Sequence, residues 1–402
     1  MLADKNIVLG ITGGIAAYKA VDLASKLTQA GARVNVVMTK SATEFITPLT
    51  FRSVTGNDVS TEMFGPNALP GITHITWADA AHLVAIVPAT ANIIAKLANG
   101  IADDMLTCIV LATKAPVIVA PAMHTNMFEN PVTQENLAKL KARGFTIIEP
   151  EYGRLASGAM GKGRLPETGK IMGTIQQVLG KSGELAGKSI VVTAGGTRED
   201  IDAVRFIGNR SSGKMGYALA EAARDRGAKV TLITAPTALP DPAGVDVIHI
   251  TSAVQMKEAV TKATARVDAL IMAAAVADYQ PKKAVKGKIR KAAAGPELSL
   301  EMIRTPDVLA DVKGNFLRVG FAAETGERLI EHARKDELER KQLDLVVAND
   351  ISAPGSGFEV DTNKVLIIDK QGNVEDLPLM TKREVADRVL DRVVGMLGRK
   401  GS

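Results

Sequence analysis

Residues 188–216, KSIVVTAGGTREDIDAVRFIGNRSSGKMG, decide the fold of this chain. The run Ser189–Thr193 is apolar and β-branched and meets a glycine turn at Gly195, which predicts a buried strand followed by a loop. A helix over Met215–Ala223 begins only after a charged, turn-rich segment. Arg205, Arg210 and Lys214 lie in that segment, toward the start of the helix. A strand, a glycine turn and a helix N-terminus beside cations suit a phosphate-rich ligand.

The first half of the chain starts in a similar way. Asn6–Gly10 runs into Thr12-Gly13-Gly14, and here the helix follows directly. Strand and helix patterns then alternate, which predicts a doubly wound parallel sheet. The predicted strands are Val8–Leu9, Arg33–Met38, Val84–Val87, Val117–Ala120 and Thr146–Ile148. The predicted helices are Ile15–Ala30, Ala42–Thr50, Ile93–Ala98 and Gln134–Arg143.

The second half repeats this alternation and ends in a helix over Lys382–Leu397. Further strands are predicted at Ala269–Ala273, Val319–Phe321, Leu345–Val347 and Lys364–Ile368. Residues 181–187 are rich in glycine, lysine and serine and are typical of a linker. We therefore predict two Rossmann-like or flavodoxin-like three-layer α/β domains in tandem, at 1–180 and 188–402.

Composition excludes several classes of protein. The 402 residues carry 49 basic and 44 acidic side chains, a net charge of +5, and 3% aromatic residues, which argues against a nucleic-acid partner. The single cysteine, Cys108, cannot form an intrachain disulfide, and its apolar run predicts a buried strand. Charged residues and prolines interrupt the longest apolar runs, so we expect no membrane span and a cytoplasmic protein.

The glycine turn of the first half does not match a dinucleotide fingerprint. Gly10-Ile11-Thr12-Gly13-Gly14 lacks the G-x-G-x-x-G spacing, and no carboxylate follows the second strand. This argues against NAD and leaves a mononucleotide, or NADP held by Lys40. Thr90 and Asn92 open a helix at a strand end; they fit either a monophosphate site or a simple N-cap.

Two further stretches of the first half admit two interpretations each. His74 follows a Pro-Gly loop, so it is either a general base in a loop or a surface histidine. Gly153–Leu165 carries four glycines, which favours a mobile lid or a floppy loop over a packed element. None of the five histidines has metal-ligand spacing.

The motifs carry a resemblance to a known family. GITGGIAAYK, the His74 loop, PATANIIAKLANGIADD, PAMHTNMF and GKGRLPE resemble flavin-dependent cysteine decarboxylases. AGGTREDIDAVRFIGNRSSGKMG, AAAVADYQP, KIRK, GFAAET and VAND resemble the ligase fused to one of them. Together, over nearly the whole chain, they resemble bacterial bifunctional coenzyme A biosynthesis proteins, which join a phosphopantothenoylcysteine decarboxylase to a phosphopantothenate–cysteine ligase.

The resemblance implies the chemistry of the first half. FMN would oxidise the cysteinyl thiol to a thioaldehyde, carbon dioxide would leave, and the electrons would return, so that no second redox partner is needed. His74 matches the family's catalytic histidine. The positions implied to hold FMN are Gly13, Gly14, Ile15, Thr39, Thr90, Ala91, Asn92 and Met105.

Two positions depart from the family pattern. His124 stands where the family has an asparagine that binds the substrate carboxylate, and an imidazolium would replace it only when protonated; Asn126 is a second candidate. Ser157 stands where many members carry a lid cysteine that protonates the intermediate. Because a hydroxyl is a far weaker acid than a thiol, we expect the proton to come through water or another group.

The second half carries a strongly basic run. Lys282–Lys291 holds six basic residues and no acid, just after Asp278. A solvated face and a nucleic-acid surface are two interpretations; a triphosphate beside Mg²⁺ on Asp278 is the third and explains the run better. The resemblance implies CTP. Its implied nucleotide positions are Ala273, Ala274, Ala275, Asp278, Lys288, Pro306, Asp307, Val308, Leu309, Phe321 and Lys341.

The resemblance also implies the steps of ligation. The carboxylate of 4'-phosphopantothenate attacks CTP to give an acyl-cytidylate and pyrophosphate, and the amine of L-cysteine then displaces CMP. Asn209 matches the asparagine that holds the acyl-cytidylate, with Arg205 beside it, and Lys288 is assigned to the second step. Glu337 stands where the family often has a lysine; either Lys335 or Arg340 replaces that lysine, or triphosphate binding is weaker.

Two rival functions were weighed against this one. An NADP-dependent reductase requires a full glycine fingerprint, and a nucleic-acid-binding scaffold requires more basic patches and aromatic residues. The expected partners are therefore small molecules, with no nucleic acid and no membrane. The resemblance further implies a homo-oligomer with trimeric decarboxylase and dimeric ligase contacts, up to a dodecamer.

Overall fold

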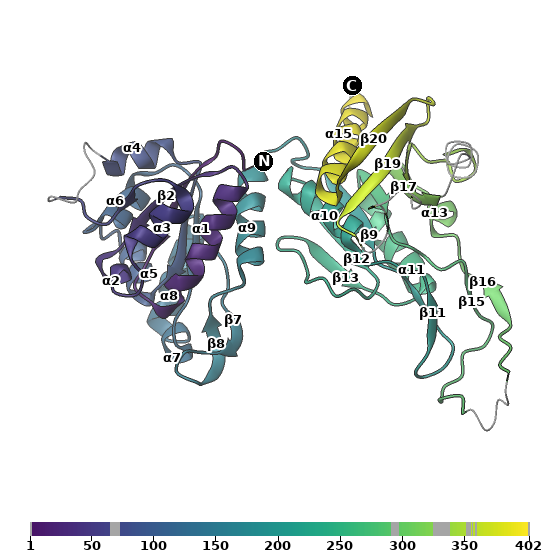
Figure 1. Ribbon diagram of the computed structural model, residues 1–402, viewed down its shortest axis with the longest axis horizontal. Coiled ribbons are helices and arrows are strands. Elements are labelled where there is room, and N and C mark those ends of the chain that lie inside the picture. Colours follow the sequence, from purple (N-terminus) through teal and green to yellow (C-terminus); the bar gives the residue numbers. More distant parts are fainter. Residues whose placement is uncertain are drawn as a thin grey trace. The chain divides into compact units, whose positions relative to one another are not determined.

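The computed structural model describes residues 2–64, 73–290, 297–324, 338–350, 355, 357 and 360–400. The chain divides into two compact units, Met1–Gly180 and Lys181–Ser402, and each is described by itself (Figure 1). Residues 184–187, expected to be linker, pack on the second unit: Leu185 is buried in its core, and its N–H donates to the carbonyl of Arg226 at 2.9 Å.

The first unit is built on a parallel sheet of order β3-β2-β1-β4-β5-β6, the Rossmann order. Its strands are β1 (Asn6–Ile11), β2 (Arg33–Met38), β3 (Val59–Ser60), β4 (Leu83–Ala89), β5 (Val117–Pro121) and β6 (Thr146–Ile147). Its helices are η1 (Ile15–Tyr18), α1 (Lys19–Gln29), α2 (Lys40–Thr43), α3 (Pro48–Thr55), α4 (Thr73–Ala80), α5 (Ala91–Asn99), α6 (Met105–Ala112), α7 (Thr125–Phe128), α8 (Pro131–Ala142) and α9 (Thr168–Gly180).

Both faces of this sheet are covered, as its continuous apolar strands require. Ile7 and Leu9 of β1 belong to one core cluster with side chains of α1, α3 and α9. Val8, which points the other way, belongs to a second cluster with side chains of α5, α6 and α8. The predicted helix Ala42–Thr50 is wrong, because Thr47 caps a new helix whose first residue is Pro48.

The second unit repeats the same order and then extends it. Its sheet runs β13-β12-β9-β14-β17-β18-β19-β20, parallel up to β18 and antiparallel from β18 to β20. The strands are β9 (Ser189–Ala194), β12 (Lys229–Thr234), β13 (Asp246–His249), β14 (Ala269–Met272), β17 (Leu317–Glu324), β18 (Leu345–Asp350), β19 (Thr362–Asp369) and β20 (Val374–Thr381). The all-parallel expectation therefore fails at this edge, where the loop after β19 is short enough for a hairpin.

Helices and two small hairpins complete the second unit. The helices are α10 (Lys214–Asp225), α11 (Ala253–Ala263), η2 (Thr264–Arg266), α13 (Val308–Asp311) and α15 (Lys382–Lys400). The additional paired strands are β10 (Arg198–Asp200) with β11 (Phe206–Gly208), and β15 (Tyr279–Pro281) with β16 (Met302–Arg304). The β10–β11 hairpin is what delays the helix after β9, as the sequence of residues 188–216 indicates.

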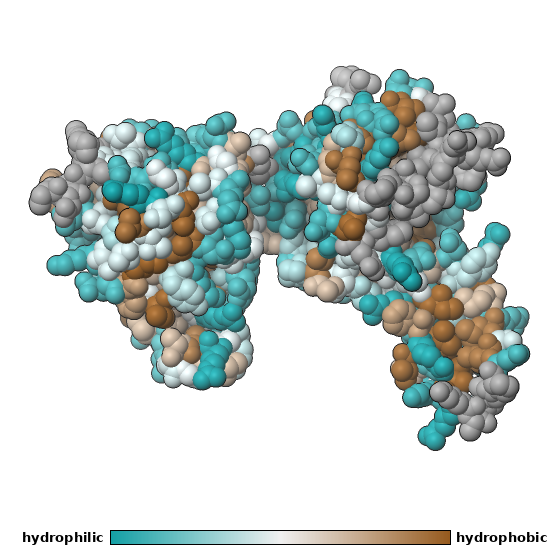
Figure 2. All heavy atoms as spheres, viewed as in Figure 1, coloured by the Kyte–Doolittle hydropathy of each residue, from teal (hydrophilic) through white to brown (hydrophobic). Residues whose placement is uncertain are grey.

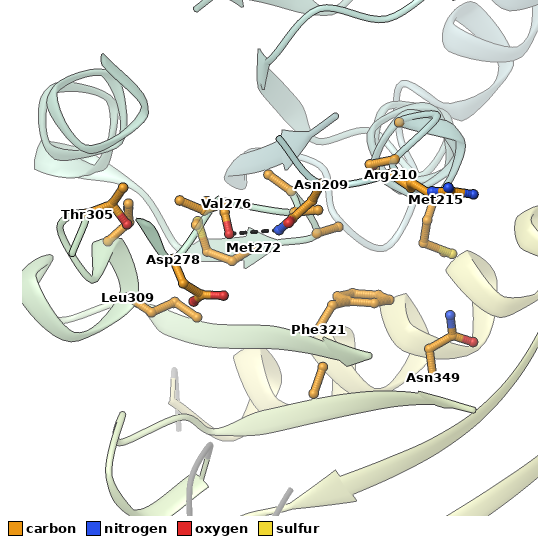
Figure 3. Close-up of a pocket in the computed structure, with 18 of the residues that line it drawn as sticks. Asn209, Arg210, Met215, Met272, Val276, Asp278, Thr305, Leu309, Phe321 and Asn349 are labelled. Atoms are coloured by element: carbon orange, nitrogen blue, oxygen red, sulfur yellow. Dashed lines mark hydrogen bonds between the residues drawn. The ribbon is translucent and has the colours of Figure 1, made fainter. Parts of the chain in front are cut away.

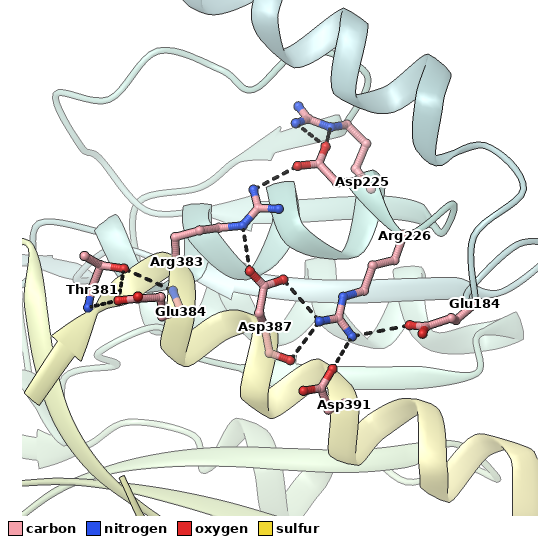
Figure 4. A network of polar contacts seen from close by, with 9 residues as sticks. Glu184, Asp225, Arg226, Thr381, Arg383, Glu384, Asp387 and Asp391 are labelled. Carbon is pink, nitrogen blue, oxygen red and sulfur yellow. Dashed lines mark hydrogen bonds and ion pairs between the residues drawn. The ribbon is translucent and has the colours of Figure 1, made fainter. Parts of the chain in front are cut away.

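Ion pairs join α10 to α15 on one face of this sheet (Figure 4). The buried carboxylate of Asp225 accepts from Arg224 at 2.6 Å and from Arg383 at 2.8 Å. Arg226 meets Asp391 at 2.7 Å and Glu184 at 3.5 Å. Since removing one partner of a buried pair costs several kcal/mol, this network fixes α10, whose N-terminus faces the site described below.

Candidate active sites

The two central loops of the first unit meet at the carboxyl edge of its sheet. The Thr12 hydroxyl, which follows β1, donates to the carbonyl of Pro88 at 2.7 Å and accepts from the N–H of Thr90 at 3.1 Å. Thr90 in turn caps α5 by accepting from the N–H of Ile93 at 3.4 Å. Because the strand order reverses between β1 and β4, these loops lie at the topological switch point, where such folds bind ligands.

The predicted flavin positions fit a ligand at this edge. A Cβ at Gly13 would lie 2.4 Å from Cβ of Ser41 and 2.8 Å from its carbonyl oxygen, so only glycine lets the loop lie this close to α2. The Thr39 hydroxyl is buried without a hydrogen-bond partner in the described part of the chain, and a polar group of a ligand would satisfy it.

The other predicted flavin positions fall into two groups. Gly14 ends the loop after β1, Ile15 begins η1, and Ala91 and Asn92 begin α5, so all four lie at the carboxyl edge, where Ile15 and Asn92 are exposed. Met105 differs, because it is 4% exposed and belongs to an apolar core cluster at the start of α6. Its side chain therefore packs as a core residue.

His74 is the second residue of α4, so the expectation of a loop histidine is wrong. The β-branched neighbours Thr73 and Ile75 have low helix propensity, so the sequence predicts this helix only weakly. Packing of α4 against α6 provides the stability that the intrinsic helix propensity does not. The Thr113 hydroxyl, just after α6, donates to the carbonyl of Ala78 at 2.9 Å and ties the two helices together. His74 itself is half-buried.

Gly153–Leu165 forms a packed hairpin, so the expectation of a loop too glycine-rich to pack is wrong. β7 (Glu151–Arg154) pairs with β8 (Met160–Arg164), and Ser157 is exposed at the turn. The glycines of β8 allow its backbone to lie close to residues 123–125. A Cβ at Gly163 would lie 2.1 Å from the carbonyl oxygen of Met123, and one at Gly161 would lie 2.1 Å from the Thr125 hydroxyl. The hairpin thus lies on the segment that carries His124.

The ring of His124 already has a defined role in this segment. Its Nδ1 accepts from the N–H of Asn126 at 3.3 Å and caps α7. A ring nitrogen that accepts carries no proton, so the neutral ring has its hydrogen on Nε2. His124 is exposed and presents that N–H as a donor, and protonation is therefore not required for it to bind a carboxylate.

Cys108 lies in the helix α6, and the expectation of a strand is wrong. Its thiol is half-buried, burial raises its pKa, and its Sγ lies 3.5 Å from the carbonyl oxygen of Ala102. The apolar run that suggested a strand belongs to a helix with apolar residues on most sides, a case that periodicity cannot distinguish.

The second unit contains a cavity of about 860 Å³ at the carboxyl ends of β14, β17 and β18, lined also by residues 209–216, which lead from the β9 side of the sheet into α10 (Figure 3). The switch point between β9 and β14 therefore opens into a volume that holds a nucleotide-sized ligand. The predicted residues that line it are Asn209, Ala273, Ala274, Ala275, Asp278, Pro306, Asp307, Val308, Leu309, Phe321 and Lys341. Glu337 lies outside the described residues.

Asn209 and Asp278 face this cavity (Figure 3). The Asn209 side-chain N–H donates to the carbonyl of Val276 at 3.1 Å, which holds the carboxamide in place. The described residues contain no group of three or more His, Cys, Asp or Glu side chains that could hold a metal ion. A Mg²⁺ ion at Asp278 would therefore take its other ligands from phosphates and water, as Mg²⁺ commonly does.

Two cations of the cavity, Arg304 and Lys382, were not predicted as site residues. Arg304 and Lys382 lie far along the chain from the glycine turn, yet both line the cavity with Arg210, Lys214 and Arg340. Lys382 is 5% exposed, and its ammonium donates to the carbonyls of Val360 and Gly357, the latter at 3.0 Å. Burial lowers the pKa of Lys382 to about 8. A lysine in the first turn of a helix is unfavourable, because it opposes the helix dipole. This unfavourable position was the feature of the sequence that could have identified Lys382 as a site residue.

Arg205 and Lys288 are predicted site residues that do not line the described cavity. The Arg205 guanidinium pairs with the buried carboxylate of Asp202, and Lys288 lies on the exposed segment after β15. No helix in the described part of the chain is long and apolar enough to cross a membrane.

Fold and sites together define a protein of two tandem α/β units, each with a nucleotide-type site at its topological switch point. Family models agree: residues 1–180 match "Flavoprotein", and residues 185–396 match "DNA/pantothenate metabolism flavoprotein C-terminal domain". The first unit is thus a flavoprotein domain.

Full-length relatives give the particular family. The Coenzyme A biosynthesis bifunctional protein CoaBC of Bacillus subtilis (strain 168) is 46% identical over 100% of this chain and 99% of its own length. That of Vibrio vulnificus (strain YJ016) is 44% identical over 99% of each chain. The crystal structure of a C-terminal domain of such a protein covers 54% of this chain and 100% of its own, at 41% identity and a TM-score of 0.46. The chain belongs to the family of coenzyme A biosynthesis bifunctional proteins.

Proposed function

We propose that the second unit, from about residue 188, ligates 4'-phosphopantothenate to L-cysteine with CTP, and that the first unit decarboxylates the product to 4'-phosphopantetheine with FMN. Family membership supports the pathway. The observation that carries the ligase assignment is the 860 Å³ cavity, in which the Asn209 carboxamide, the Asp278 carboxylate and several cations converge. Cations beside one carboxylate are the arrangement that a triphosphate with Mg²⁺ requires.

The ligase residues act by binding and orienting. Arg210, Lys214 and Lys341 offset the charge of the CTP phosphates, and Asp278 orients the bound Mg²⁺. The substrate carboxylate attacks the α-phosphorus, and pyrophosphate leaves. Asn209, fixed by its bond to Val276, directs its second N–H to the acyl-cytidylate while the cysteine amine displaces CMP.

In the first unit, the residues of this chain orient the substrate and move its protons. FMN, when bound, accepts two electrons from the substrate and returns them. We assign thiol deprotonation to His74, with its ring in the first turn of α4. His124 donates its Nε2–H to the substrate carboxylate, and the hairpin that bears Ser157 covers the site and excludes water.

One reconstitution tests both reactions. The full-length protein receives 4'-phosphopantothenate, L-cysteine, CTP and Mg²⁺, and mass spectrometry follows 4'-phosphopantetheine while the absorbance spectrum reports bound flavin. We expect a flavin spectrum, CMP and pyrophosphate, and complete turnover despite Ser157. Colourless protein that FMN does not reconstitute, or ATP-dependent turnover without CTP, would contradict the proposal.

Asn209→Asp isolates the ligase step. We expect pyrophosphate release to remain measurable, and amide formation to slow about 100-fold, because an anion replaces the N–H donor beside the acyl-cytidylate. Asn315→Asp is the matched control, since Asn315 is exposed and does not line this cavity. An unchanged rate of amide formation in Asn209→Asp would remove Asn209 from the mechanism.

A further inference from the structure

The basic segment after β15 has almost no core of its own. Of residues 282–290, Ile289 alone is half-buried and the others are exposed. The β15–β16 arm projects from the second unit (Figure 1) and carries a patch of apolar residues (Figure 2). Val285 and Ile303 are among its exposed apolar side chains. Apolar burial does not fix the backbone of residues 282–290. Its position therefore depends on polar contacts with the rest of the second unit.

Those contacts centre on Asp202, in the turn between β10 and β11. Its side chain is fully buried, and its Oδ1 accepts from the N–H groups of Val204 at 2.8 Å and Arg205 at 2.9 Å. Its Oδ2 accepts from Nε of Arg205 at 3.0 Å and from the N–H of Ile289 at 3.0 Å. The Arg205 guanidinium, together with these N–H donors, holds the pKa of Asp202 well below its usual range.

Ile289 is therefore held at both of its backbone groups. Its N–H donates to Asp202, and its carbonyl accepts from Nη2 of Arg205 at 3.1 Å. A third bond, from the N–H of Val285 to the carbonyl of Ile201 at 3.0 Å, fastens the same segment to the same turn. Lys288 immediately precedes Ile289, so its Cα position is set by this ion pair, whose carboxylate is buried.

We propose that Asp202 is the positioning residue of Lys288: its buried carboxylate clamps the backbone of Ile289 and thereby fixes where the Lys288 ammonium is presented. The inference rests on the proposed ligase function and on the role in its second step, amide formation, that the family resemblance implies for Lys288. Asp202 does not line the described cavity and acts only through the segment that it holds. Arg205 shares in this clamp, which explains why a residue predicted to bind substrate is turned toward Asp202.

Asp202→Asn is a nearly isosteric test. N–H donors face both carboxylate oxygens, so the amide NH₂ group of asparagine would meet a donor on either side. We expect the Ile289 amide to lose protection from hydrogen exchange and amide formation to slow about tenfold, as the loss of one buried charge-assisted bond predicts. Pyrophosphate release reports the first step, which precedes the amide formation assigned to Lys288, so we expect it to stay within about twofold and to show that this unit is folded.

Two further variants complete the design. Asp200→Asn is the matched control, because Asp200 is exposed on β10 and should leave both steps and the exchange pattern unchanged. Ile289→Pro removes the N–H that donates to Asp202 and leaves the buried turn intact. This variant therefore tests the proposal if Asp202→Asn does not fold. It should slow amide formation as Asp202→Asn does.

A double-mutant cycle separates this inference from the proposed function. If Asp202 acts through Lys288, Asp202→Asn adds nothing to the defect of Lys288→Met, and the double variant is no slower than Lys288→Met alone. Lys288→Met at the wild-type rate would overturn the proposed role of Lys288 and this inference with it. A slow Lys288→Met whose defect multiplies with that of Asp202→Asn would overturn the inference alone.

Discussion

Replacing Gly163 by alanine tests how the β7–β8 hairpin is held against the segment that carries His124 and thereby over the site that we propose for the first unit. Gly163 has φ of 149°, a region that side chains with Cβ enter at a cost of about 1–3 kcal/mol. The new Cβ would lie 2.1 Å from the carbonyl oxygen of Met123, so β8 must separate from the loop between β5 and α7 that contains Met123. Separation also breaks the bond from the Met123 N–H to the Gly163 carbonyl, 3.0 Å long and worth about 1 kcal/mol.

These costs oppose docking of the hairpin by about 2–4 kcal/mol, or roughly 30-fold to 800-fold in the docking equilibrium. We expect the kcat for decarboxylation of 4'-phosphopantothenoylcysteine to fall about tenfold or more, while flavin content and CTP-dependent ligation by the same chain stay unchanged. Gly169→Ala is the control, because a Cβ there meets no atom within 4 Å. Gly163→Ala with a wild-type kcat and wild-type flavin content would refute the reasoning.

Two further predictions concern Thr12 and Lys382. Thr12→Val leaves the Thr90 N–H and the Pro88 carbonyl unpaired, so we expect a loss of about 1–3 kcal/mol in unfolding free energy and weaker retention of FMN on dialysis; unchanged retention would contradict it. Lys382 has a folded pKa of about 8 against an ordinary value of 10.5, so between these values the unfolded chain binds a proton that the folded chain lacks. The contribution of Lys382 to stability therefore rises with pH from about 8 to 10.5, and urea melts of Lys382→Met should lose that rise; an identical slope would disprove the assignment.

The strands were predictable because each central strand is covered on both faces. Val84–Val87 and Val117–Ala120 read as continuous apolar runs, and the structure has strands over both. Helices with exposed or mixed surfaces were harder to predict from the sequence. The helix α4 was not predicted, because the residues around His74 are β-branched. Its stability comes from packing against α6, and the local sequence around His74 does not reveal that contact.

The same limit separates the predictable from the unpredictable site residues. Thr12 and Thr90 follow buried strands, so their place at the carboxyl edge could be read from the sequence. Lys382 and Asp202 could not be placed, because the contacts that define them join segments far apart in the chain. Gly163 contributed to the wrong prediction of a loose loop over Gly153–Leu165 for a different reason. A glycine needed for close packing cannot be distinguished in the sequence from a glycine in a loose turn.

The two units show how one strand order is adapted to two ligands. In the first, η1 follows β1 almost at once, so Gly13 and Thr12 bring the loop close against α2 and the β4 loop. In the second, the β10–β11 hairpin stands between β9 and α10, which moves the helix N-terminus away along the chain. The site gains Asn209, the cations that follow it, and the turn that clamps Ile289. The longer insertion at the switch point of the second unit thus fits the triphosphate and second substrate that we propose for it, and the short turn of the first unit fits the proposed flavin monophosphate.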